Sequence, residues 1–95
     1  MFELIDNLIH VLESRSIEYT VELRDGELDV YFNPNCVSCK VRYYPEEKHL
    51  TLEEHNGNVI HFDDKVVMAC NGDYLIFAGD YNMYHIRLAQ NYKPK

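Results

Sequence analysis

The sequence predicts an α+β domain in which one N-terminal helix packs on an antiparallel β-meander of six to eight short strands. Two observations lead to this prediction. Apolar residues recur at helical spacing near the N-terminus, and from residue 17 onward the apolar period changes to two. Turn signals then separate short alternating segments. With 95 residues, 46% of them apolar and 26% charged, the chain is expected to form a single domain, residues 1–95.

The helix is expected at about residues 2–14. Ile5, Leu8, Ile9 and Leu12 recur at the spacing of one helical face. Because the opposite face is polar, this apolar stripe must cover another element, and the strands that follow are the candidates.

A first hairpin follows the helix. The segments 17–24 and 28–32 both alternate between apolar and polar residues, and the dipeptide Asp25-Gly26 lies between them. Asp-Gly is a favoured two-residue hairpin loop, because both residues tolerate positive φ. This loop places Leu23 opposite Leu28 on the inner face.

The same register creates an electrostatic conflict on the outer face. Glu22 lies directly across from Asp29, and like charges directly opposite one another are destabilising. We therefore expect Lys40 or Arg42 on the next strand, a bound cation or a partner to offset this pair.

The second turn signal is the stretch HNGN at residues 55–58. A two-residue loop would place apolar residues opposite polar ones. A three-residue loop over His55–Gly57 instead pairs Leu52 with Ile60 and Leu50 with Phe62. Because the hydrophobic pattern sets the register, we expect the three-residue loop, with Gly57 in the left-handed conformation.

The third hairpin, residues 65–78, is apolar on both faces, and a last strand is expected in 82–88. A hairpin of this kind is typical of the middle of a sheet, beneath a helix and with its other face also covered. Either the sheet curls over itself, or the second face meets another chain. A homodimer through residues 65–78 is one such arrangement.

The stretch NPNCVSCKVRYY, residues 33–44, is the only one whose residues suggest a chemical site. Cys36 and Cys39 form a C-x-x-C pair, and Cys70 stands apart. A structural zinc site needs a fourth ligand and usually a second pair, so the simpler interpretation is a turn containing thiols and no cofactor. A small zinc-stabilised domain using Cys36, Cys39 and Cys70 remains the alternative. An odd cysteine count argues against a secreted disulfide scaffold and favours a cytoplasmic setting.

The charge distribution limits the classes of partner. The net charge is −7, and residues 1–31 and 46–80 each carry eight acids and two bases. Phosphate contacts need a basic face, so we expect no direct nucleic-acid binding. No apolar run reaches the length of a membrane span. Acidity of this kind either solubilises the protein or binds a basic surface.

No enzyme class is indicated by the sequence. Ser14, Ser16 and Ser38 lack a nucleophile motif. The acidic doublets, such as Asp63-Asp64, point to opposite faces of a strand and flank predicted turns, so they do not form a catalytic carboxylate pair. We expect a protein that is not an enzyme.

The sequence therefore predicts a small acidic interaction module that binds or inhibits a protein with a basic surface. Mobile-element inhibitors, such as phage anti-defence and toxin-immunity proteins, share this size and charge, and they occupy basic nucleic-acid-binding sites. Tyrosines beside acidic rows fit such a binder, although tyrosine is also a good strand former. The predicted partner-binding residues are Glu18, Glu22, Glu27, Asp29, Tyr31, Asp63, Asp64 and Tyr81.

Overall fold

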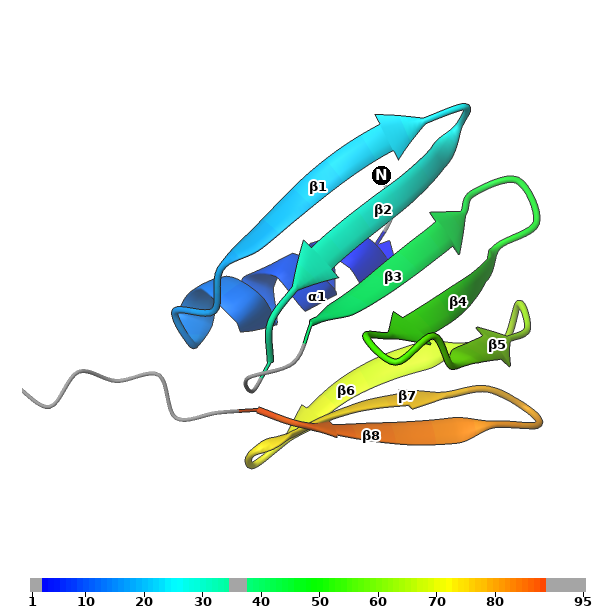
Figure 1. The fold of residues 1–95 in the computed structure, drawn as a ribbon. Helices are drawn as coiled ribbons and strands as arrows, with labels where there is room; N and C mark the ends of the chain where they lie inside the picture. The colour runs from blue at the N-terminus through cyan, green and yellow to red at the C-terminus, as the bar shows by residue number, and fades with distance from the viewer. Residues whose placement is uncertain (1–2, 35–37, 89–95) are drawn as a thin grey trace, which may run out of the picture.

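The structure, a computed structural model, describes residues 3–34 and 38–88 and confirms the α+β class. Helix α1 (Glu3–Ser14) precedes eight antiparallel strands in two sheets (Figure 1). A five-stranded sheet has the order β1-β2-β3-β4-β5, and a three-stranded sheet has the order β6-β7-β8. No helix among the described residues is long and apolar enough to cross a membrane. The strands are β1 (Tyr19–Arg24), β2 (Glu27–Phe32), β3 (Cys39–Tyr44), β4 (His49–Glu54), β5 (Val59–Phe62), β6 (Val67–Asn71), β7 (Tyr74–Ala78) and β8 (Met83–Arg87).

Helix α1 buries the predicted stripe and ends with a sharp change of direction. Ile5, Leu8 and Leu12 are fully enclosed. At the C-terminus, Ser16 adopts a φ of 59°, and the backbone N–H of Ile17 donates to the carbonyl of Leu12 at 2.9 Å. This is the hydrogen bond of a Schellman motif. It directs the chain into β1, and it buries Ile17 against the core.

The first hairpin has the predicted register. Asp25 and Gly26 have φ values of 54° and 81°, as a type I′ turn requires. Leu23 consequently lies opposite Leu28 on the inner face.

The second hairpin confirms the three-residue loop. Leu50 pairs with Phe62 and Leu52 with Ile60, and Gly57 has a φ of 94°. The apolar side chains of β4 and β5 therefore share the inner face, as the hydrophobic pattern required.

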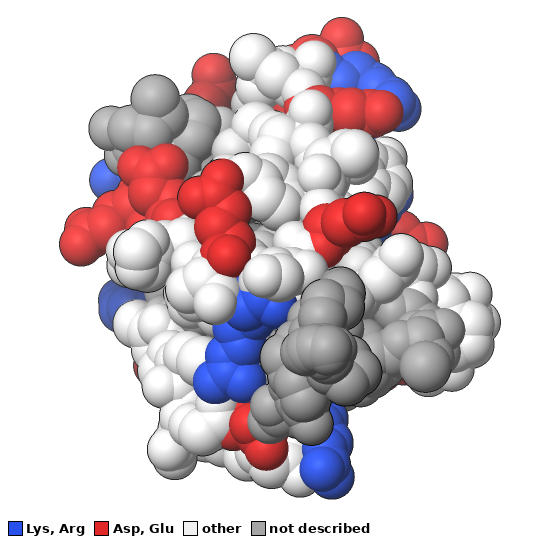
Figure 2. All heavy atoms as spheres, turned by 90° about the vertical axis from the view of Figure 1, so that its left-hand side faces the viewer, with Lys and Arg blue, Asp and Glu red and all other residues white. Residues whose placement is uncertain are grey.

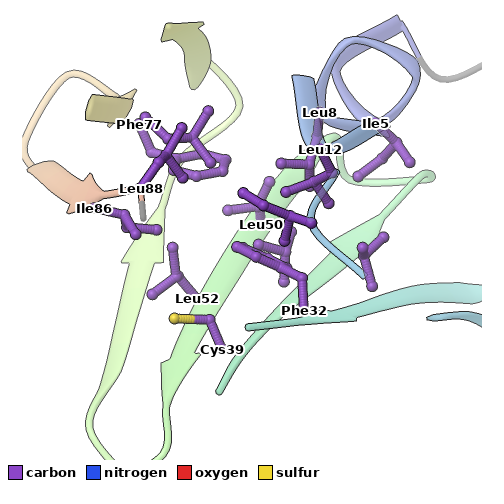
Figure 3. Packing of buried hydrophobic residues seen from close by; sticks show 14 of the residues in the cluster. Ile5, Leu8, Leu12, Phe32, Cys39, Leu50, Leu52, Phe77, Ile86 and Leu88 are labelled. Atoms are coloured by element: carbon purple, nitrogen blue, oxygen red, sulfur yellow. The ribbon is translucent and has the colours of Figure 1, made fainter. Parts of the chain in front are cut away.

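One core lies between the helix and the two sheets. Figure 3 shows Leu50 and Leu52 of β4 between the side chains of α1 and those of the three-stranded sheet. The rings of Phe62 and Phe77 lie 6.1 Å apart between their centroids, at 39°, which joins β5 to β7. Each such buried side chain contributes about 1.5–3 kcal/mol of transfer free energy.

The third hairpin corrects one prediction. It does not lie in the middle of a single sheet with both faces covered. Together with β8 it forms the separate three-stranded sheet, whose inner face buries Leu75 and Phe77. On the outer face, Val67 is 62% and Met83 66% exposed. The described part of the chain has one helix and one other sheet, and both cover the inner face, so nothing remains to cover the outer one.

The inner face of β1 is also incompletely covered. Val21 is 42% and Leu23 71% exposed, although both lie on the side of the sheet that faces the core. The end of α1 reaches only the beginning of this strand, where the hydroxyl of Tyr19 donates to a carboxylate oxygen of Glu13 at 2.6 Å. The strand that α1 contacts most is β6, so the helix does not cover the far end of the first hairpin as well.

Candidate protein-binding surface

The predicted partner-binding residues fall into two groups in the structure. The first group lies on the outer face of the five-stranded sheet, on or beside β1 and β2. The second lies beyond the end of β5, near the start of β8. The first group comprises Glu18, Glu22, Glu27, Asp29 and Tyr31, and the second comprises Asp63, Asp64 and Tyr81.

Within the first group, Asp29 is inaccessible. Its side chain is 1% exposed, and Arg42 on β3 binds it in a bidentate manner, with Nε at 2.7 Å from Oδ1 and Nη2 at 3.0 Å from Oδ2. The Arg42 hydrogen bond holds the pKa of the Asp29 carboxyl below its usual range, against the opposing effect of burial. Glu22 does lie opposite Asp29. The cation expected to offset this pair is therefore Arg42.

The neighbouring carboxylates are paired as well. An oxygen of Glu22 lies 3.0 Å from Nη2 of Arg24, and an oxygen of Glu27 lies 3.7 Å from Nε of Arg42. A partner would have to compete with these internal cations, so the two carboxylates offer little net attraction.

Tyr31 belongs to the same network. The ammonium of Lys40 lies 5.7 Å from the centroid of its ring, and its hydroxyl donates to Asp29 at 3.5 Å. Lys40 also pairs with Glu53 at 3.1 Å. Tyr31 and Glu18 line an open depression of about 490 Å³, in which Glu18 is the only carboxylate among the described lining residues.

The surface nearby is electrostatically mixed. Figure 2 shows the side of the molecule at which β1 begins, with acidic side chains separated by neutral and basic ones. A continuous acidic face is not present there.

The second group is brought together in one place. Asp63, Asp64 and Tyr81 line an open depression of about 470 Å³, which we call the acidic depression. Segments from four parts of the chain form it: the β3–β4 loop, the start of β4, the end of β5 with the turn after it, and the loop before β8. Its lining residues are Glu47, His49, His61, Phe62, Asp63, Asp64, Tyr81 and Asn82.

Asp63 fixes the loops around the acidic depression. Its Oδ1 accepts hydrogen bonds from the backbone N–H of Lys65 at 3.2 Å and of Asp80 at 3.4 Å. The side-chain amide of Asn82 donates to the carbonyl of His61. These contacts tie the loop before β8 to the end of β5, and they position the intervening Tyr81.

Aromatic and titratable groups lie at the rim. Tyr81 is 87% exposed. The ring of His49 stacks on that of Tyr44 with centroids 4.4 Å apart at 29°, and its Nε2 lies 3.7 Å from an oxygen of Glu47. Carboxylates beside an exposed aromatic ring form an environment for an ammonium or a guanidinium group, through charge-assisted hydrogen bonds and cation–π contact.

The structure does not unite the two groups. They lie towards opposite edges of the five-stranded sheet, and strands β2 and β5 are separated by three spacings of about 4.8 Å, or about 14 Å in all. Sequence reasoning had not assigned Glu47, His49, His61 or Asn82 to this surface. A signal was available, because the register that pairs Leu50 with Phe62 places both histidines on the outer face.

The cysteines do not form a recognisable site in the described residues. Cys39 on β3 is buried, and burial, followed by the charge of Glu54, raises its pKa to about 11. Thiol exchange needs the thiolate, which such a pKa disfavours. Cys70 is exposed, with Sγ 3.8 Å from Nη2 of Arg15. Cys36 lies outside the described residues, and among those described no group of three side chains is arranged to hold a metal ion.

No family model, curated protein or solved structure matches this chain. Its function is therefore inferred from geometry and charge.

Proposed function

We propose that the protein is a small, acidic, non-enzymatic interaction module. It binds the basic surface of another macromolecule and blocks that surface. The acidic depression carries this proposal. It gathers the carboxylates of Glu47, Asp63 and Asp64 beside the exposed ring of Tyr81. A lysine or arginine side chain of the partner fits this chemistry, with its charge on the carboxylates and its stem or guanidinium plane on the ring.

The choice of the acidic depression over the outer face of β1 and β2 follows from the pairing of charges. Arg24 and Arg42 already form ion pairs with Glu22, Glu27 and Asp29, which leaves one negative charge for the three carboxylates. Asp64, in contrast, is exposed in the turn after β5. Its charge is available to a partner, and the net charge of −7 steers a basic partner from a distance.

We propose that the partner is a protein whose basic surface normally binds nucleic acid. Such surfaces present lysine and arginine in rows to contact phosphates. Carboxylates that occupy them exclude the nucleic acid without any catalytic step. We place the protein in the cytoplasm, because Cys39 and Cys70 are free thiols, which a reducing compartment maintains.

Titration of the ¹⁵N-labelled protein with an oligo-arginine peptide, followed by NMR, tests the proposal. We expect chemical-shift changes to concentrate on the acidic depression and to weaken with added salt. Asp64→Asn should weaken binding about two- to fivefold, whereas the matched variant Glu22→Gln, which removes the same charge from a paired site, should not. Equal effects of the two variants would mean that only net charge matters, and the proposal would fail.

The outer face of the three-stranded sheet is the second candidate surface. Val67 and Met83 are exposed there beside the partly buried Ile76. We propose that a homodimer through residues 65–78 is the alternative use of this face. Monomeric behaviour at every concentration in sedimentation would exclude it.

A further inference from the structure

Strand β1 forms an open edge of the five-stranded sheet. It pairs with β2 on one side, and Figure 1 shows no element of the described chain beside its other side. Its six residues contain no proline, glycine or lysine, and its register with β2 has no bulge. Natural edge strands are usually shielded by proline, by bulges or by charged side chains, and of these β1 has only Glu22 and Arg24. An edge of this length, flat and free of proline, is suited to pairing with another strand.

The backbone groups available for that pairing follow from the loop. In a two-residue hairpin the flanking residues, here Arg24 and Glu27, exchange hydrogen bonds across the turn. Hydrogen-bonded pairs alternate along the ladder, so Tyr19, Val21 and Leu23 point their N–H and C=O groups away from β2. The side chains of these three residues lie on the inner face, where the last two are largely exposed.

We propose that β1 pairs with β1 of a second copy of this chain, antiparallel and about a two-fold axis at Val21. The two five-stranded sheets then continue as one ten-stranded sheet. Val21 lies opposite the partner's Val21, and Tyr19 lies opposite the partner's Leu23. Just before the strand, Glu18 lies opposite the partner's Arg24. One register thus aligns three apolar pairs and two pairs of oppositely charged side chains.

The charges select this register over its neighbours. A shift of one residue would place apolar side chains opposite polar ones. A shift of two residues in one direction places Glu22 opposite the partner's Glu22, and in the other direction it places Glu18 opposite the partner's Glu22. Both arrangements set like charges directly against each other. Because the strand is complementary to itself in the remaining register, a second copy fits this edge better than an unrelated strand does.

The dimer also accounts for the exposed apolar residues of β1. Leu23 lies beyond the reach of α1 in its own chain, but in the dimer it lies beside the partner's Tyr19, near the end of the partner's helix. Val21 is covered by its symmetry mate. The acidic depression remains accessible, because it lies at the β5 edge of the sheet. Failure of this proposal therefore leaves the proposed binding of a basic partner unaffected.

Analytical ultracentrifugation over a range of concentrations tests the dimer. We expect the mass to rise from the 11.3 kDa of one chain towards twice that value. Val21→Lys places two like charges at the two-fold axis and should weaken the dimer about tenfold. Val67→Lys makes the same change on the outer face of the three-stranded sheet. It should leave the dimer through β1 intact, whereas it would weaken a homodimer through residues 65–78. A wild-type protein that stays monomeric, or a dimer lost on Val67→Lys, would overturn the proposal.

A charge exchange tests the register itself. Glu18→Arg and Arg24→Glu should each weaken self-association, because each creates like-charge pairs across the axis. When the two variants are mixed, both cross-axis pairs have opposite signs again, and the mixture should recover the wild-type sedimentation. Circular dichroism confirms that each variant is folded. A mixture that remains as monomeric as its components would refute the pairing.

Discussion

The ion pair between Arg42 and Asp29 offers the most quantitative test of the structure. Arg42→Met removes the cation and keeps most of the aliphatic stem. The carboxylate of Asp29 is then left in a site where it is 1% exposed and directly opposite Glu22. We expect this variant to be clearly less stable than the wild type.

The magnitude follows from the geometry. Removing one partner of a fully buried ion pair costs about 3–5 kcal/mol. The Arg42 side chain is 28% exposed, so water can partly reach the site, and about 2–3 kcal/mol is expected. Asp29→Asn removes the same pair from the other side. It leaves Arg42 near Glu27, at 3.7 Å, and relieves the repulsion with Glu22, so a loss of about 1 kcal/mol is expected.

Urea denaturation at several pH values is the assay. In the wild type, the pKa of Asp29 is lower in the folded than in the unfolded state. The pair therefore stabilises the fold above pH of about 4, the unfolded pKa of aspartate, and this stabilisation is lost as the pH falls through the folded pKa. In Arg42→Met, burial without the cation raises the folded pKa instead. The difference between the two proteins should thus begin to shrink above pH of about 4, as the pH falls through the raised folded pKa of the variant, and it should go on shrinking below about 4, as the wild type loses its stabilisation.

The double variant Arg42→Met/Asp29→Asn is the control. It contains no unpaired buried charge, so it should be more stable than Arg42→Met alone. Equal losses from the two single variants, or a double variant whose loss is the sum of both, would refute this account of the outer face.

Three further outcomes are expected. Cys39, with a pKa raised to about 11, should resist alkylation at pH 8 until the protein unfolds, whereas the exposed Cys70 should react. Peptide mass spectrometry measures both alkylation rates, and equal rates would contradict the burial of Cys39. Gly79→Ala should lower the free energy of unfolding by about 1 kcal/mol, because the added Cβ would lie 2.8 Å from Oδ1 of Asp63, which holds the neighbouring loops. Thermal denaturation measures this loss, and the loss should disappear when Asp63 is also replaced by alanine. Native mass spectrometry of protein purified without chelator should give the mass of the chain alone, and one zinc per chain would instead assign Cys36 to a metal site with the other two cysteines.

Much of the strand pairing was predictable, because it depends on local patterns. Asp25-Gly26 favours a type I′ turn wherever it lies between alternating strands, and Gly57 permits the left-handed residue of a three-residue loop. Once the turns are placed, the apolar period of two determines which residues are opposed. The conflict between Glu22 and Asp29 followed directly from this register, and Arg42 of the next strand was one of the offsets that the sequence left open.

The acidic depression was predictable only in part. The sequence singled out Asp63, Asp64 and Tyr81 as charged or aromatic residues near turns, but it did not indicate that four segments meet there. Residues 47–49 and 81–82 are more than 30 positions apart along the chain. Their proximity depends on how the three-stranded sheet packs across the core from β4 and β5. No local pattern encodes that packing.

By itself, the sequence determined the helix, the loops and registers of two hairpins and the apolar alternation of their strands, because backbone preferences and side-chain alternation act over a few residues. Only the tertiary structure decided which of those faces is covered. The hairpin of β6 and β7 belongs to a separate sheet. Asp29 is buried although it lies on the polar face, whereas Val21 and Leu23 are exposed although they lie on the apolar face. The physical reason is that burial depends on what lies opposite, and a single twelve-residue helix cannot cover two sheets.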